Sequence, residues 1–63
     1  MKDYGRMEQA FSNIVEKQQE EWYEVFESDY YEEAMADELG LSYEQLLNDQ
    51  EFQEYSKLLA EEL

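Results

Sequence analysis

The sequence contains no cysteine, no histidine and no proline, and it has only two glycines. Without cysteine, neither a disulfide nor a thiolate metal site can stabilise the fold. Without histidine, the chain lacks the commonest metal ligand and the commonest general base. Because proline and glycine are the strongest markers of loops and linkers, their scarcity argues against an internal linker. A length of 63 residues therefore predicts one small domain over residues 1–63.

Basic residues are also scarce. Four Lys and Arg stand against 18 Asp and Glu, which gives a net charge of −14. The four basic residues (Lys2, Arg6, Lys17 and Lys57) all lie outside the span 18–56. An acidic surface of this kind repels nucleic acid and anionic membranes and attracts basic proteins. We therefore expect a basic protein partner, no direct contact with nucleic acid and no membrane binding.

Long apolar runs are absent as well. The N-terminal sequence MKDYGRMEQ lacks the apolar stretch of a signal peptide. No window approaches the roughly 20 apolar residues of a membrane span. These features predict a cytoplasmic protein, located in a bacterial host if a phage encodes it. High charge with low hydropathy is also typical of disorder, but one Trp, six Tyr and three Phe favour a folded chain.

The apolar residues of the first half recur at steps of three and four, which indicates one helical face. They are Met7, Ala10, Phe11, Ile14, Val15, Trp22, Val25 and Phe26. This stripe predicts a long first helix from about Tyr4 to Phe26, with Gln18 as a polar interruption. Such a helix is about 33 Å long.

The middle of the chain predicts a short second helix. Ser28 or Asp29 offers an N-cap, and Gly40 ends the helix as a left-handed C-cap. The predicted apolar face consists of Tyr31, Ala34, Met35 and Leu39.

The last third carries two capping patterns. Ser42 and Gln45 match a capping box, and Asn48 and Glu51 repeat the pattern six residues later. They predict a short helix over 43–47, a break near Asn48 and a final helix from about Asp49 to Glu62. Its inward residues are predicted to be Phe52, Tyr55, Leu58 and Leu59. A single bent helix is the alternative.

No segment alternates with period two, so no sheet is expected. The fold class is all-α: a small bundle of three to four helices, with the long N-terminal helix packed by shorter C-terminal helices. Because small scaffolds without covalent or metal staples need regular helices or an oligomeric partner, a homodimer stays open.

Candidate catalytic and metal-binding residues do not assemble in the sequence. The serines have no histidine to activate them, and so short a chain cannot build a cleft around paired carboxylates. Neither glycine stands in a calcium-loop frame. We therefore predict that the chain is not an enzyme and has no cofactor and no specific metal site.

The segment 35–46 resembles the turn of a helix-turn-helix, with Ala36 followed by Gly40 between apolar positions. The helix that would read DNA carries Glu44 and no Arg or Lys, whereas DNA readers need basic contacts to phosphate. We therefore interpret this segment as a helix corner tied by glycine.

Four glutamates form a regular row. Glu16, Glu20, Glu24 and Glu27 are separated by four, four and three residues, along one face of the predicted first helix. Four helical residues rise about 6 Å, close to the roughly 6.8 Å between alternate phosphates of a DNA strand. An ordinary solvated face is the alternative interpretation.

Other residues extend this row or flank it. Tyr23 and Tyr30 are candidate anchors against an Arg-rich surface, or they cover helix ends or a dimer seam. The candidate partner-binding residues are Glu16, Glu20, Tyr23, Glu24, Glu27, Asp29, Tyr30, Glu32 and Glu33. A second acidic patch comprises Glu44, Asp49, Glu51 and Glu54.

In size, one-sided charge, lack of Cys and His, and interleaved aromatic and acidic residues, the whole chain resembles the small acidic DNA-mimic proteins of bacteriophages and mobile elements. The resemblance implies a non-catalytic inhibitor of a CRISPR effector, restriction enzyme or other nucleic-acid-binding protein. The alternative is a helical adaptor or regulatory subunit. Its apolar stripe (Phe11, Ile14, Trp22 and Phe26) would meet a partner helix or a second copy.

Overall fold

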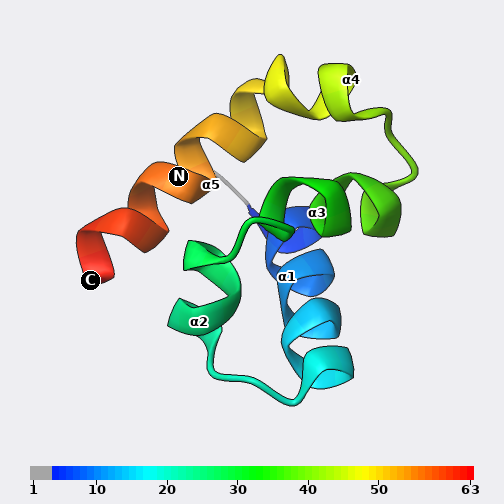
Figure 1. The fold of residues 1–63 in the computed structure, drawn as a ribbon. Coiled ribbons are helices and arrows are strands. Elements are labelled where there is room, and N and C mark those ends of the chain that lie inside the picture. The colour runs from blue at the N-terminus through cyan, green and yellow to red at the C-terminus, as the bar shows by residue number, and fades with distance from the viewer. Residues whose placement is uncertain (1–3) are drawn as a thin grey trace.

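A computed structural model describes residues 4–63 as an all-helical fold with no strand in that range (Figure 1). Its five helices are α1 (Gly5–Gln18), α2 (Trp22–Glu27), α3 (Tyr31–Leu39), α4 (Tyr43–Leu47) and α5 (Gln50–Glu62). The prediction of an all-α fold is confirmed, although five helices replace the expected three or four.

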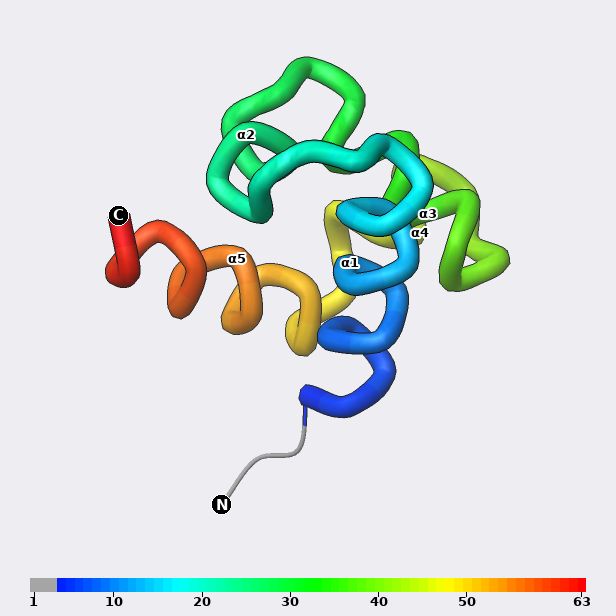
Figure 2. The backbone as a smooth tube through the Cα atoms, turned by 90° about the horizontal axis from the view of Figure 1, so that it is seen from below, coloured from blue at the N-terminus to red at the C-terminus, as the bar shows by residue number. Residues whose placement is uncertain are grey.

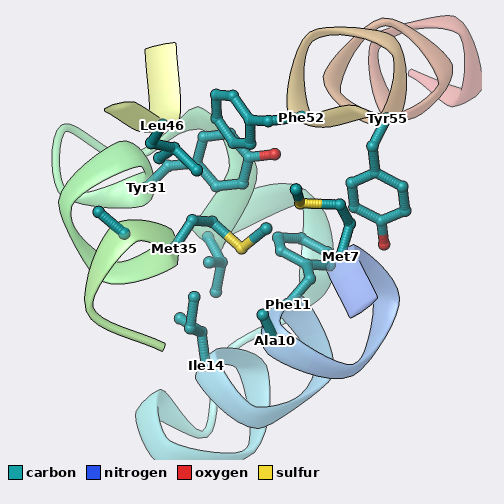
Figure 3. Close-up of a cluster of buried hydrophobic side chains, with 11 residues drawn as sticks. Met7, Ala10, Phe11, Ile14, Tyr31, Met35, Leu46, Phe52 and Tyr55 are labelled. Carbon is teal, nitrogen blue, oxygen red and sulfur yellow. The ribbon is translucent and has the colours of Figure 1, made fainter. Parts of the chain in front are cut away.

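The helices wrap around a core to which all five contribute. α3 packs on α1 and on α4, α2 folds back against α1, and α5 crosses α1. The C-terminal half of α5 then extends away from the body of the molecule (Figure 2). The buried residues are Met7, Ala10, Phe11, Ile14, Val25, Tyr31, Met35, Ala36, Leu46, Phe52 and Tyr55 (Figure 3).

Tyr31 is the centre of the core. Its ring meets Phe11 and Phe26 edge to face, with centroid distances of 5.8 and 5.1 Å, and it stacks on Phe52 at 5.6 Å. Its hydroxyl lies 3.0 Å from the hydroxyl of Ser56. Aromatic pairs of this kind contribute about 0.5–1.5 kcal/mol each beyond area burial, so one side chain joins α1, α2, α3 and α5.

The predicted long first helix is wrong. α1 ends at Gln18, Gln19 adopts a left-handed conformation with φ 54°, and α2 begins only at Trp22. A straight helix of about 33 Å exceeds the longest dimension of the molecule, 26 Å. Folding back at Gln19 instead brings Val25 to complete burial. In the sequence, the break of the helix is indicated by a gap in the apolar stripe between Val15 and Trp22.

The predicted corner around Gly40 is confirmed. Gly40 has φ 72°, its backbone N–H donates to Asp37, and the N–H of Leu41 donates to the carbonyl oxygen of Ala36 at 2.9 Å. This is the pattern by which a left-handed residue satisfies the free carbonyls of a helix end. Ser42 and Gln45 then form the predicted capping box of α4.

Three local predictions need correction. Neither Ser28 nor Asp29 caps α3: its N-cap is Tyr30, without a side-chain bond, and the Ser28 hydroxyl donates to the carbonyl of Val25 instead. The chain does break near Asn48, but Asp49 caps α5 by accepting from Glu51 and Phe52.

The third correction concerns α5. Phe52 and Tyr55 are buried and Leu59 packs against the core, as predicted, but Leu58 is 42% exposed. At 100° per residue, Leu58 lies about a quarter turn from the stripe of Phe52, Tyr55 and Leu59. It therefore faces solvent beside that stripe.

Candidate acidic interface

The outer side of α2 combines acid with an exposed aromatic ring. Trp22, Val25 and Phe26 occupy its inner side, since Val25 is fully buried and the two aromatic residues pack against the core. Helical periodicity then turns Tyr23, Glu24 and Glu27 outward, and all three are exposed, Tyr23 to 43%.

The turns on either side of α2 lie close together. The Tyr30 hydroxyl donates to a Glu20 carboxylate oxygen at 2.6 Å, which joins the turn before α2 to the turn after it. This hydrogen bond is the main reason that the pKa of Tyr30 is raised, and the charges of Glu20 and Glu24 act in the same direction. Glu20, Glu24 and Tyr30 therefore share one neighbourhood.

We call this region the α2 acidic face. It consists of Glu20, Glu21, Tyr23, Glu24, Glu27, Asp29 and Tyr30. Glu21 is exposed and was missed by the sequence prediction, although it forms an acidic doublet with Glu20 just before Trp22. It is also the N-cap residue of α2, and its carbonyl oxygen accepts the N–H groups of Glu24 and Val25.

Glu32 and Glu33 belong to a different neighbourhood, at the contact between α3 and α4. The Tyr43 hydroxyl donates to a Glu32 carboxylate oxygen at 2.8 Å. This bond, with the charges of Glu32 and Glu33, raises the pKa of Tyr43. Tyr43 is 49% exposed and was not among the predicted site residues. Its partner lies 11 positions away, so no local pattern identifies it.

The row of four glutamates does not exist as predicted. Glu16 lies on α1, on the side opposite the buried Met7 and Ile14, whereas Glu20 lies in the turn and Glu24 and Glu27 lie on α2. Since the helix breaks at Gln19, the regular 6 Å spacing is lost between Glu16 and Glu24. Only the part of the row on and around α2 remains together.

The second predicted patch is partly neutralised. Arg6 lies 3.1 Å from a carboxylate oxygen of Asp49 and 3.5 Å from one of Glu51, so two of its four acids face a cation. Asp49 is also occupied as the cap of α5. Glu44 is exposed in the first turn of α4, and Glu54 is half-buried on α5 and has an interaction partner.

The ion pairs of residues 4–63 all lie away from α2. Besides Arg6, Lys17 pairs with Glu38 on α3, and this bond raises the pKa of the lysine. Within the same residues, no Lys or Arg pairs with a carboxylate of the α2 acidic face. Among residues 4–63, no ion pair therefore neutralises the charge of that face.

Across residues 4–63, no three acidic side chains converge to hold a metal ion. A shallow depression lies on α1, lined by Gly5, Glu8, Gln9 and Ser12, none of which was a predicted site residue. No helix of this range has the length and apolar character that crossing a bilayer requires.

The stripe proposed for a helical adaptor is mostly interior. Phe11 is 5% and Ile14 is 2% exposed, while Trp22 and Phe26 pack against the core from its edge. The folded chain thus uses this stripe for its own stability.

Comparison of the chain with protein-family models, curated proteins and solved structures found no match.

Proposed function

We propose that this protein is a non-catalytic inhibitor that binds the basic nucleic-acid-binding surface of a target protein, such as a CRISPR effector, a restriction enzyme or another DNA-binding protein, in the cytoplasm of a bacterial host. The observation that carries the proposal is the α2 acidic face, which has no pairing cation within residues 4–63. A basic groove that evolved to bind phosphates attracts such a surface.

The close approach of the acids supports this function. Glu20 accepts a hydrogen bond from the Tyr30 hydroxyl at 2.6 Å, and the charge of Glu24 also raises the pKa of that hydroxyl. On α2 itself, Glu24 and Glu27 are three positions apart, and like charges at helical spacing destabilise a helix by about 0.2–0.5 kcal/mol per pair. A cationic partner removes this repulsion when it binds. The partner therefore associates more strongly with the pair of carboxylates than it would with an isolated carboxylate.

Tyr23 adds an anchor to the charge. Its ring is 43% exposed and meets Trp22 edge to face at 6.1 Å, which fixes its direction. Exposed tyrosine next to carboxylates offers an arginine both a ring to stack on and an anion to pair with. The α2 acidic face therefore suits Arg-rich surfaces.

The burial of Phe11 and Ile14 favours this proposal over the adaptor. An adaptor that used their stripe would first have to open its own core. In a domain of this size, which buries only about 60% of its unfolded surface, that opening approaches complete unfolding.

A capture experiment tests the proposal. Tagged protein is incubated with bacterial lysate at about 0.15 and about 0.5 M salt, between which the screening length falls about twofold. The test variant carries Glu24→Lys and Glu27→Lys. The control variant carries Glu8→Lys and Asp37→Lys, two exposed acids on other helices, and has the same net charge.

We expect wild type and control to retain a DNA-binding protein at low salt, to release it at high salt and to lose it to competing DNA. The test variant should retain none, with an unchanged circular dichroism spectrum. Capture that ignores salt and DNA would refute the proposal. Equal loss in both variants would show that total charge, and not the α2 acidic face, is responsible.

A further inference from the structure

The apolar stripe of α5 continues past the core of the protein. Phe52, Tyr55, Leu59 and Leu63 follow at steps of three, four and four, which places them on one side of the helix. Phe52 and Tyr55 are buried, Leu59 is half-buried, and Leu63 is 60% exposed. The stripe thus passes from the core into solvent along α5 and its C-cap, Leu63.

Leu58 widens this apolar surface. It lies beside the stripe and is 42% exposed, so three leucines stand within the last six residues of the chain. We call Leu58, Leu59 and Leu63 the leucine face. The C-terminal half of α5, which carries Leu58 and Leu59 and leads to Leu63, extends from the body of the molecule in both views (Figures 1 and 2).

The surroundings of the leucine face are acidic. Glu62 lies between Leu58 and Leu59 around the helix axis and is exposed, as is Glu61, whereas Lys57 lies almost half a turn from Leu59. Both views also place α2 on the same side of the molecule as this half of α5. An occupant of the leucine face is therefore exposed to negative charge from its own helix and from α2.

This charge decides which occupant fits. A second copy would bring its own net charge of −14 to the contact, and like charges oppose such an association. A segment with cationic side chains beside an apolar edge instead satisfies both the leucines and the carboxylates. Charge complementarity thus selects a basic amphipathic partner.

We propose that the leucine face is a docking site for a basic amphipathic segment of the target protein, next to the surface that the α2 acidic face occupies. This inference rests on the proposed function and adds an apolar contact to it. The leucine face supplies an interaction that salt does not screen, while the α2 acidic face supplies one that it does.

The test uses two synthetic peptides as probes. One is an amphipathic helix of Lys and Leu, and the other has the same length and charge with Ser in place of each Leu. Binding to full-length protein is measured by titration calorimetry for wild type, for Leu58→Ser and for Leu47→Ser. Leu47 on α4 is 40% exposed, almost the same as Leu58, and is the matched control.

We expect wild type to bind the Lys/Leu peptide at least about tenfold more tightly than the Lys/Ser peptide. A tenfold ratio requires less free energy than the burial of one leucine side chain provides. Leu58→Ser should remove most of this difference, and Leu47→Ser should preserve it. Equal affinity for both peptides, or equal effects of the two substitutions, would overturn the docking site.

The failure of the proposed function looks different. If the Lys/Ser peptide does not bind wild type, or if Glu24→Lys with Glu27→Lys leaves its binding unchanged, the charge-based function is wrong. A dimer seen by sedimentation equilibrium and dissolved by Leu58→Ser would overturn the docking proposal in another way, because it would assign the leucine face to a second copy.

Discussion

Alkaline titration of the core tyrosine provides a quantitative test of the structure. Tyr31 is 4% exposed, its ring contacts three phenylalanines, and its hydroxyl lies 3.0 Å from that of Ser56. Burial raises the pKa of Tyr31 to about 12. In the unfolded chain the pKa returns to about 10.

The sign of the effect follows from this difference. The folded protein holds the phenol proton more tightly than the unfolded chain does, so the stabilisation is complete below pH 10. It is lost as the pH rises from about 10 towards 12, by an amount that approaches about 3 kcal/mol. For a domain whose total stability is about 5 kcal/mol, such a loss is close to complete unfolding.

The variant Tyr31→Phe separates this effect from general charge repulsion. At pH 7 it should be less stable than wild type by about 1 kcal/mol, because it loses the hydrogen bond to Ser56 and leaves that hydroxyl unpaired. Phenylalanine does not ionise, so the order should reverse at about pH 11. Tyr55 also has a pKa raised by burial. It is present in both proteins, but its charge raises the pKa of Tyr31, so in wild type it adds to the alkaline loss that the comparison measures.

Urea denaturation followed by circular dichroism, at a series of pH values from 7 to the alkaline range, measures this reversal. Tyrosinate absorbance reports the ionisation directly. Parallel stability curves for the two proteins, with no crossing at alkaline pH, would refute the assignment of Tyr31 to the centre of the core.

Further predictions concern the helix ends. Gly40→Ala should destabilise by about 1 kcal/mol, or about 4–8 °C in Tm, because no atom lies within 4 Å of the added Cβ and the whole effect is left-handed backbone strain. Gln19→Gly should be neutral or stabilising, because residue 19 has a φ of 54°, which glycine adopts without strain. If Gly40→Ala and Gln19→Gly lowered the Tm equally, the left-handed conformations at these two turns would be contradicted. Asp49→Ala should lower the free energy of unfolding by about 1 kcal/mol and Asp49→Asn by much less, since asparagine keeps the cap. Ser42→Ala should likewise cost about 1 kcal/mol in urea denaturation, and no change would argue against the capping box.

Local chemistry allowed several elements to be predicted correctly. The left-handed end at Gly40, the capping box of Ser42 and the break near Asn48 each depend on residues within six positions of one another. The apolar stripes predicted which residues enter the core, because periodicity identifies a buried face without knowledge of what covers it. The charge composition likewise predicted a strongly acidic surface, because net charge does not depend on which residues are in contact.

Competition between distant segments decided the rest. Tyr30 and Tyr31 are identical and adjacent in sequence, yet Tyr31 packs in the core against Phe11 of α1 and Phe52 of α5, while the Tyr30 hydroxyl donates to Glu20. Arg6 pairs with Asp49 and Glu51 across more than 40 residues and offsets part of the charge of the second patch, whereas no such pair forms with the α2 acidic face within residues 4–63.

The sequence by itself determined the all-helical class, most of the core residues and the excess of acid, because these follow from composition and from spacing along the chain. Only the tertiary structure decided where the first helix breaks, since a reversal at Gln19 gains its free energy from burying Val25 against other helices. The same packing decided which carboxylates meet a cation and which remain open on α2. Such pairings are settled by the free energy of the whole fold and have no signature within a local stretch of residues.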